Sequence, residues 1–292
     1  MIAPRPPFSI PLQGRAPLTL GPRTLVMGVI NVTPDSFSDG GAWQDPARAL
    51  ETALAMEAAG ADLIDLGAES TRPGAVPVEA ADEIARLGPV LRVLVPRLRI
   101  PISIDTAKAE VAGFALDEGA ALVNDVSGLT FDPALGPLVA ARGVPLVAMH
   151  TRGRPADMQA RADYGDVVAD VSRELQEALD RALAAGVPRD RVILDPGIGF
   201  AKRADHSLAL LAGLQRLSEL GRPLLVGVSR KSFLTFATGP LEAAGRDWPT
   251  SAAVTASILA GAHVVRVHRV PEMVLVARVA DAIRNAVGGE VK

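Results

Sequence analysis

Polar side chains stand at the ends of a series of short apolar segments rich in β-branched residues. Two of these segments, residues 25–31 and 102–105, end in Asn31 and Asp105. Carboxylates and amides at such positions can bind the donors and acceptors of a flat heterocycle, and cations there can bind an anion. One such residue could be a helix cap, but a repeated series favours a common site. The full series is Asn31, Asp105, Asn124, Asp195, Ser229, Arg266 and His268.

The segments that carry these residues have the composition of buried strands and alternate with helical segments. Eight rounds of strand then helix predict an α/β fold, a single-domain (β/α)8 TIM barrel. The predicted strands are residues 25–31, 63–67, 102–105, 122–125, 146–150, 192–195, 224–229 and 264–268. Segments with helical spacing include residues 46–59, 78–94, 166–185 and 271–287. We expect residues 1–20 to form an N-terminal extension and residues 21–292 the barrel.

A barrel places its chemistry at the carboxyl ends of its strands. Because side chains alternate along a strand, Arg266 and His268 share one face, whereas Asn124 and Asp125 lie on opposite faces, so that only one of this second pair can face the interior. An open doubly wound sheet would alternate in the same way. However, the first strand-to-helix turn lacks the G-x-G-x-x-G sequence that binds a dinucleotide phosphate.

Two loops combine turn-forming residues with groups suited to a substrate. The first, residues 31–41, holds an apolar ring, Phe37, among polar turn residues, and an ordinary surface turn is the alternative interpretation. The second, residues 69–74, places Arg72 before a proline, which favours an extended backbone. Together they have the composition of mobile covers over an anionic substrate.

Two later segments also carry polar and aromatic groups. Residues 195–202 contain glycines that let the backbone approach a ligand, and Phe200 can stack on a flat group. In residues 228–232 the G-x-S-x-G pattern of a nucleophile elbow is absent, and Arg230 and Lys231 could simply be solvated. A lysine at the mouth of a barrel, facing carboxylates, is better explained as a hydrogen-bond donor to a bound heterocycle.

The composition excludes several classes of protein. A chain of 292 residues with 49% hydrophobic and 22% charged residues is globular, and its net charge of −3 offers no basic surface for nucleic acid or anionic membranes. The absence of cysteine excludes disulfides and thiolate metal sites. Aromatic residues make up only 3%, so Ala, Val, Leu and Ile must fill the core. The early prolines and the lack of a long apolar run predict a cytoplasmic protein.

The four histidines show no zinc-binding pattern. His206 and His263 are expected to be structural or solvated, and no H-E-x-x-H sequence is present. A metal, if used, is better sought as Mg²⁺ bound by oxygen ligands and substrate phosphates.

The chain resembles dihydropteroate synthase of folate biosynthesis along most of its length. The resemblance rests on GVINVTPDSFSDGG, ESTRPG, ISIDT, NDVSG, Met149 with His150, residues 195–202, SRKS and RVH, in that order. It implies condensation of 6-hydroxymethyl-7,8-dihydropterin pyrophosphate with para-aminobenzoate, by a dissociative displacement that uses Mg²⁺. It also implies small-molecule substrates, inhibition by sulfonamides and a homodimer.

The resemblance assigns roles to individual residues. Those implied for pterin binding are Asp105, Asn124, Met149, Asp195, Lys231 and Arg266. Those implied for pyrophosphate are Asn31, Thr71, Arg266 and His268, with Asn31 also a ligand of the metal. Those implied for aminobenzoate are Phe37, Arg72, Pro73, Phe200 and Ser229. The catalytic residues implied are Asp35, Asp39, Lys231, Arg266 and His268.

Two positions depart from the pattern of the family. Arg269 stands where an aspartate usually follows the histidine, and alternation points it away from the barrel interior. Residues 202–205 also differ, which leaves the role of Lys202 open. Two alternatives to the synthase are a pterin-binding methyltransferase barrel and a noncatalytic pterin-binding homologue.

Overall fold

Eight parallel strands form a closed barrel in the computed structural model, which describes residue 2, residues 5–33 and residues 45–287. Neighbouring strands pair in the order β8-β7-β6-β5-β4-β3-β10-β9, and a bridge between Leu194 and Leu224 joins the two ends of this series. The predicted (β/α)8 barrel is therefore confirmed. The strands are β3 (Leu25–Asn31), β4 (Leu63–Gly67), β5 (Ile102–Asp105), β6 (Leu122–Asp125), β7 (Leu146–Met149), β8 (Val192–Asp195), β9 (Leu225–Val226) and β10 (Val264–Val267).

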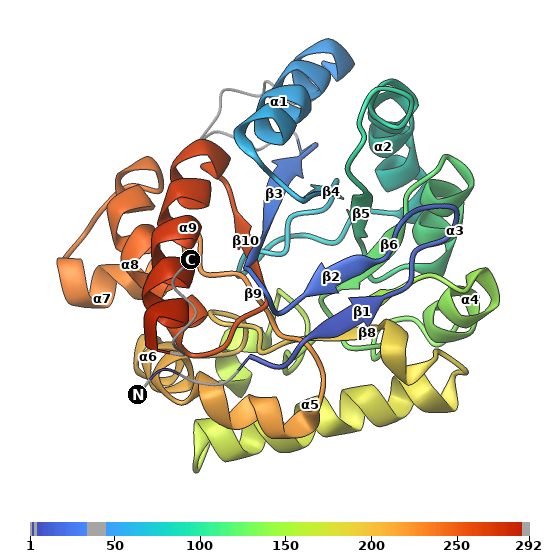
Figure 1. The fold of residues 1–292 in the computed structure, drawn as a ribbon. Coiled ribbons are helices and arrows are strands. Elements are labelled where there is room, and N and C mark those ends of the chain that lie inside the picture. Colours follow the sequence, from blue (N-terminus) through green and yellow to red (C-terminus); the bar gives the residue numbers. More distant parts are fainter. Residues whose placement is uncertain (1, 3–4, 34–44, 288–292) are drawn as a thin grey trace.

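Helices surround the barrel as an outer ring (Figure 1). They follow the strands in the chain and bury their apolar faces against them, as at Leu87 and Leu91 of α2. Asp45 caps α1 by accepting a hydrogen bond from Ala47 N, and Gly60 ends the helix with a φ of 105°. The helices are α1 (Pro46–Ala59), α2 (Ala80–Leu94), α3 (Ala109–Asp117), α4 (Leu135–Arg142), α5 (Val167–Ala184), α6 (Ala204–Ala212), α7 (Thr235–Thr238), α8 (Asp247–Leu259) and α9 (Val270–Val287).

The barrel interior is apolar at one end and polar at the other. Side chains near the amino ends of the strands form a single apolar cluster, which includes Leu25, Leu63 and Val147. Alternation then brings polar side chains inward near the carboxyl ends, as at Asp65 and Asp105. The carboxyl end is therefore where the fold gathers groups able to do chemistry.

A short antiparallel hairpin lies across the apolar end of the barrel (Figure 1). It consists of β1 (Phe8–Ile10) and β2 (Leu18–Leu20), both within the predicted N-terminal extension. Ile10 and Leu20 are fully buried in the apolar cluster, so the hairpin acts as a plug. Arg5 reinforces this end through an ion pair of 2.8 Å with Asp281 on α9.

The structure differs from the predicted elements at several boundaries. The strand predicted over residues 224–229 is only Leu225–Val226, and a turn follows at residues 229–230, where the φ of Arg230 is 57°. His150 and His268 lie just beyond their strands rather than within them. The core is aliphatic as expected, since Phe233 is the only aromatic residue among the buried hydrophobic side chains of the described ranges. None of the helices described is long and apolar enough to cross a membrane.

Candidate active site

Arg266 on β10 is held between two carboxylates inside the barrel. Its Nε donates to Asp65 Oδ2 at 2.6 Å, and its Nη2 donates to Asp105 Oδ2 at 2.7 Å. Asn124 Nδ2 also donates to Asp65 Oδ2, at 3.0 Å. The structure thus unites Asp105, Asn124 and Arg266, three residues singled out in the sequence, around a fourth, Asp65.

Burial sets the electrostatics of this cluster. It raises the pKa of Asp105 to about 7, against the opposing charge of Arg266, and neighbouring Asp65 adds to the rise. Arg266 is half-buried, and although desolvation lowers its pKa, Asp65 and Asp105 raise it above its usual range and keep the guanidinium protonated. Asp65 Oδ1 is buried with no hydrogen-bond partner among the described residues. The cluster therefore holds one cation and carboxylates capable of accepting further hydrogen bonds.

Lys231, Asp195 and Phe200 form a second group beside this cluster. Lys231 Nζ donates to the carbonyl of Ile198 and lies 4.5 Å from the centre of the Phe200 ring. Burial lowers the pKa of Lys231 to about 8, although Asp195 opposes this. Burial raises the pKa of Asp195, which accepts a hydrogen bond of 2.8 Å from Gly197 N. Lys231 is therefore not simply solvated, which was one of the two sequence interpretations.

Ser229 and His268 form a hydrogen-bonded pair. Ser229 Oγ accepts from His268 N at 3.2 Å and lies 2.9 Å from His268 Nδ1. Burial, with Arg266 and Arg230 nearby, lowers the pKa of His268 to about 3, so the ring is neutral near pH 7. A hydroxyl that donates to Nδ1 leaves the ring proton on Nε2. His268 can then offer a neutral N–H donor to an anion.

The remaining predicted residues lie around this centre with fewer contacts. Met149 is buried and pairs in register with Asp195, and Asn31 ends β3 beside Gly67. Thr71 is half-buried, whereas Arg72 and Pro73 are exposed on the second loop. That loop is tied to the segment after β7 where Gly74 N donates to Pro155 O at 2.9 Å.

Three predicted residues lie outside the described residues. They are Asp35, Phe37 and Asp39.

Alternation along the strands is confirmed at two further positions. Asn124 faces the interior, whereas Asp125 accepts hydrogen bonds from Ser127 N and Leu129 N in the turn after β6. Arg269 points away from the interior, where it is exposed and pairs with Glu272.

Sequence reasoning missed Asp65, which lies at the centre of the polar cluster. It occupies the middle of β4 rather than its end, and a search for polar strand ends passes over it. The available signal was a charged residue between Ile64 and Leu66, on the same face as Gly67. A cluster behind the site, formed by His150, Lys202 and Glu174, was also missed.

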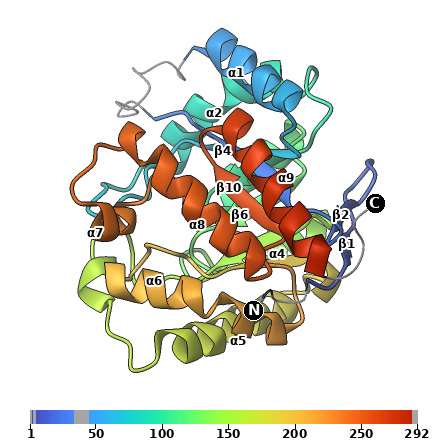
Figure 2. The ribbon, with the colours of Figure 1, turned by 60° about the vertical axis from the view of Figure 1, so that its left-hand side comes forward.

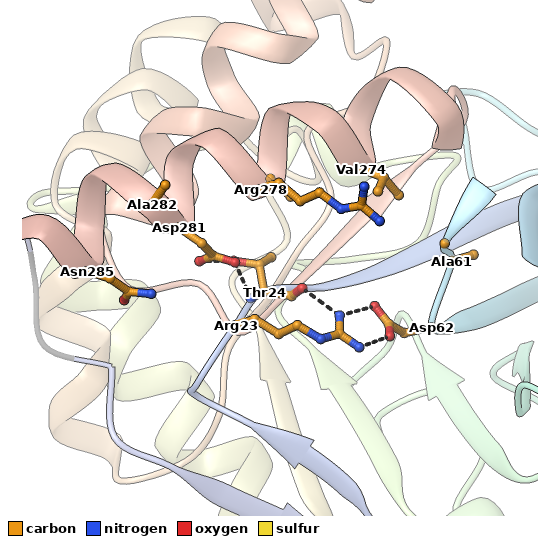
Figure 3. A pocket seen from close by; sticks show the side chains of 11 residues that line it. Arg23, Thr24, Ala61, Asp62, Val274, Arg278, Asp281, Ala282 and Asn285 are labelled. Atoms are coloured by element: carbon orange, nitrogen blue, oxygen red, sulfur yellow. Dashed lines mark hydrogen bonds and ion pairs between the residues drawn. The ribbon is translucent and has the colours of Figure 1, made fainter. Parts of the chain in front are cut away.

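A pocket of about 660 Å³ lies at the opposite end of the barrel (Figure 3). It is lined by Arg23 and Thr24 before β3, by Asp62 before β4 and by α9. Two of its charged groups, Arg23 and Asp62, pair with each other, and Asp281 accepts from Thr24 N at 2.6 Å. Because the converging polar side chains lie at the carboxyl ends of the strands, this pocket is not the candidate active site.

Side chains of the described residues do not by themselves form a metal site. Among the described residues no three His, Asp or Glu side chains are grouped so that they could hold an ion. An Mg²⁺ ion bound through one amide oxygen, substrate phosphates and water would still be consistent with this donor set.

Comparisons with known proteins agree with this architecture. The family model for pterin binding enzymes matches residues 27–268. The chain belongs to the pterin-binding enzyme family, and within it to the dihydropteroate synthases. The chain is 44% identical over 278 residues to a dihydropteroate synthase of Synechocystis, with 95% of each chain covered.

Two solved structures show the same fold. The dihydropteroate synthase of Yersinia pestis in complex with a sulfonamide drug is 39% identical, with a TM-score of 0.90 over 95% of this chain and 100% of that one. The enzyme of Xanthomonas albilineans with 4-aminobenzoic acid is 40% identical, with a TM-score of 0.87 over 99% of this chain and 100% of that one. The chain is thus a transferase of folate biosynthesis.

Proposed function

We propose that the polar carboxyl end of this barrel condenses 6-hydroxymethyl-7,8-dihydropterin pyrophosphate with para-aminobenzoate, yielding 7,8-dihydropteroate and pyrophosphate. The observation that carries the proposal is the convergence of Asp105, Asn124, Asp195, Lys231 and Arg266 at that end, in a family of pterin-binding enzymes.

The interior cluster suits the pterin ring. Asp105 and Asp195 are carboxylates that can accept hydrogen bonds from the exocyclic amine and ring N–H groups. Asn124 and Lys231 can donate to ring nitrogens and the carbonyl, and Met149 lines the same face of the sheet as Asp195. Arg266, fixed by Asp65 and Asp105, offers its guanidinium to the face of the ring, a contact worth about 0.5–2 kcal/mol.

The outer part of the site suits pyrophosphate. Arg266 supplies a positive charge and neutral His268 an N–H donor, with Thr71 on the second loop. Asn31 at the end of β3 would hold Mg²⁺ through its amide oxygen, together with pyrophosphate oxygens. When bound, Mg²⁺ would neutralise the charge that builds up on the departing pyrophosphate.

The rim of the site suits the aminobenzoate. Phe200 offers a half-buried ring, Ser229 a hydroxyl, and Arg72 and Pro73 lie on the exposed second loop. We assign Phe37 to the same pocket. A sulfonamide presents an aryl amine of similar shape, so it should compete with aminobenzoate; unchanged turnover at saturating sulfonamide and low aminobenzoate would refute this pocket.

The reaction needs little acid–base chemistry from the protein. The aryl amine is neutral and weakly basic, so no strong general base is required. Arg266 and His268 stabilise the leaving pyrophosphate, while the pterin ring and a loop carboxylate, Asp39 or Asp35, stabilise the positive methylene carbon. The displacement is then dissociative, with positioning and electrostatics supplying most of the rate. Full kcat in an Asp39→Asn variant would remove that carboxylate from the mechanism.

An apolar stripe on α9 supports a homodimer. Leu275, Val279 and Ile283 are spaced four residues apart, so they lie on one face of the helix, and all three are exposed. Exposed apolar rows of this kind are typical of protein interfaces. Sedimentation of the wild type and of Val279→Glu tests this assignment: we expect a dimer for the first and a monomer for the second, and a monomeric wild type would contradict it.

An assay of pyrophosphate release tests the function. The protein is incubated with the pterin pyrophosphate and Mg²⁺, with and without aminobenzoate, and pyrophosphate and dihydropteroate are measured. We expect both products in equal amounts only when aminobenzoate is present. Binding of the pterin without dihydropteroate would instead favour a noncatalytic or methyltransferase-type pterin-binding barrel.

A further inference from the structure

Lys202 lies at the end of the loop that follows β8, and its side chain is buried. Lys202 Nζ lies 2.8 Å from His150 Nδ1 and 3.0 Å from each of two carbonyl oxygens, those of Gly197 and Phe200. These contacts join the start of the loop to Phe200. The side chain of Lys202 thus lies inside the loop, where it contacts backbone carbonyls, rather than facing solvent.

The loop has a backbone that needs such support. Gly197, Gly199 and Ala201 all have positive φ, at 62°, 83° and 47°. This left-handed region is unfavourable for a residue such as Ala201 that carries a Cβ. The alternating conformation also prevents the regular hydrogen bonding of a helix or strand, so the carbonyls of the loop need other donors.

Side chains from outside the loop supply further donors. Lys231, after β9, donates to Ile198 O, and Tyr164, before α5, donates to Ala201 O at 3.0 Å. Together with Lys202, they occupy the carbonyls of four of the five residues from 197 to 201. Apart from the hydrogen bond of 3.0 Å from Phe200 N to Gly197 O, the loop is therefore held mainly by side chains.

His150 connects Lys202 to α5. His150 Nε2 lies 2.9 Å from Glu174 Oε2, and Glu174 also accepts from Arg152 Nε at 3.0 Å. Hydrogen bonds from His150 and Arg152 keep the pKa of Glu174 below its usual range despite partial desolvation, so Glu174 can only accept. His150 must then donate from Nε2, which leaves Nδ1 as an acceptor for Lys202.

The number of hydrogen bonds that Lys202 donates indicates its protonation state. Lys202 contacts three acceptors, and only an ammonium ion has three N–H groups to satisfy them all. Burial lowers the pKa of Lys202, and Lys231 adds to this, whereas Asp195 and Glu174 oppose it. Burial likewise lowers the pKa of His150 to about 4, which keeps its ring neutral and able to accept.

We propose that Lys202, oriented by His150 and Glu174, is a positioning residue that fixes the loop after β8 and thereby places Phe200 against aminobenzoate. The proposal rests on the proposed function, which assigns Phe200 to that substrate. Lys202 does not touch the reacting atoms; it acts on the backbone that carries the ring. The contact of Lys202 with Gly197 lies near the strand, whereas its contact with Phe200 lies farther out, at the aminobenzoate pocket. Loss of Lys202 should therefore change the KM for aminobenzoate more than the KM for the pterin substrate.

A Lys202→Met variant tests the proposal, with Arg203→Met as its matched control. Both remove one cation from adjacent positions, but Arg203 contacts Ala162 O, Asp205 and His206 rather than the carbonyls of Gly197 and Phe200. For Lys202→Met we expect the KM for aminobenzoate and the sulfonamide inhibition constant to rise at least tenfold. The KM for the pterin substrate should change less than threefold. For the control, all constants should stay within twofold.

Amide hydrogen exchange of the ligand-free protein provides a readout independent of catalysis. Lys202→Met should accelerate exchange in residues 196–201, and Arg203→Met should not. Unchanged exchange and an unchanged aminobenzoate KM in Lys202→Met would overturn the proposal. A wild type without aminobenzoate turnover would instead refute the proposed function, while the exchange experiment would still report on the loop.

Variants of His150 keep the proposal testable if Lys202→Met fails to fold. His150→Gln retains an acceptor for Lys202 and a donor for Glu174, whereas His150→Phe removes both. The phenylalanine variant should raise the aminobenzoate KM more than the glutamine variant does. Equal effects of the two variants would show that the hydrogen bond from Lys202 does not position the loop.

Discussion

Asp65 has no direct place among the residues assigned to substrate, yet it contacts two of them. One of its oxygens accepts from both Arg266 and Asn124. An amide at the same position could keep one oxygen for both donors, but it would remove the negative charge that pairs with Arg266 and would place an N–H group at the buried Oδ1 position, where no acceptor is found among the described residues. Asp65 therefore orients the cation and the amide that face the pterin.

We predict that Asp65→Asn lowers kcat/KM for the pterin substrate by about 10- to 100-fold, since hydrogen bonds to charged groups contribute about 1.5–3 kcal/mol. The side chain keeps its shape, so circular dichroism should show a folded protein. Asp62→Asn, at the other end of the barrel, is the control and should change kcat/KM less than twofold. An unchanged kcat/KM in Asp65→Asn would mean that Arg266 and Asn124 are oriented by other contacts.

At the scale of elements, the loop after β8 shows how tightly the backbone is constrained. A Cβ added at Gly197 would lie only 1.9 Å from His150 O, and its φ is 62°. Gly14 has the same φ of 62° but nothing within 4 Å of such a Cβ. A comparison of alanine substitutions at the two glycines therefore distinguishes the cost of backbone strain from the cost of a steric clash.

We predict that Gly14→Ala lowers the free energy of unfolding by about 1–2 kcal/mol, the strain of a left-handed residue. Gly197→Ala should lower the free energy of unfolding by clearly more, because the added Cβ clashes with backbone that cannot move away. The same variant should also impair catalysis. Denaturant unfolding of the two variants measures the difference. Equal losses would show that the loop can shift to accept a Cβ.

The strands and the polar residues at their ends could be predicted from the sequence, but the hydrogen-bond partners of these residues could not. Five of the eight predicted strands match in both bounds, because apolar runs that end in a polar residue mark them clearly. Period-two alternation also predicted that only one of Asn124 and Asp125 faces the interior, and the structure shows that it is Asn124. The pairing of Arg266 with Asp65, 201 residues away, depends on closure of the barrel, and no local pattern specifies it.

The hairpin and the Lys202 cluster were missed for related reasons. Each hairpin strand has three residues, too few for alternation to distinguish a strand from a loop. Lys202 was visible in the sequence, but its acceptors are mostly backbone carbonyls. A carbonyl leaves no trace in the amino-acid sequence, so only the structure could assign the residue.

At the scale of the whole molecule, the two ends of the barrel have separate tasks. The polar side chains of the candidate active site lie at the carboxyl end, while the hairpin, Arg5 and α9 close the amino end (Figure 2). His263 belongs to the closing end, where Nδ1 accepts from Leu224 N at 3.2 Å and Nε2 donates to Pro6 O at 3.0 Å. Burial lowers its pKa to about 4, partly opposed by the Pro6 carbonyl.

His263 should make stability depend on pH. An exposed histidine in the unfolded chain titrates near pH 6.5, so below that pH the unfolded state binds a proton that the folded state refuses until about pH 4. The stability that His263 contributes is therefore lost as the pH falls through this range. Relative to His263→Gln, the wild type should lose about 2–3 kcal/mol between about pH 7.5 and pH 4.5. A difference in unfolding free energy that is constant with pH would contradict this.

Positional isotope exchange tests most directly whether, in this site, the bond between the methylene carbon and pyrophosphate breaks before the amine attacks. The pterin pyrophosphate is labelled with ¹⁸O at the oxygen that joins the methylene carbon to phosphorus. It is incubated with enzyme and Mg²⁺ in the absence of aminobenzoate. We predict that the label spreads to the non-bridging oxygens of the same phosphorus, because a cation and pyrophosphate form reversibly in the site. A label that stays in the bridge while aminobenzoate turnover is rapid would contradict the dissociative displacement.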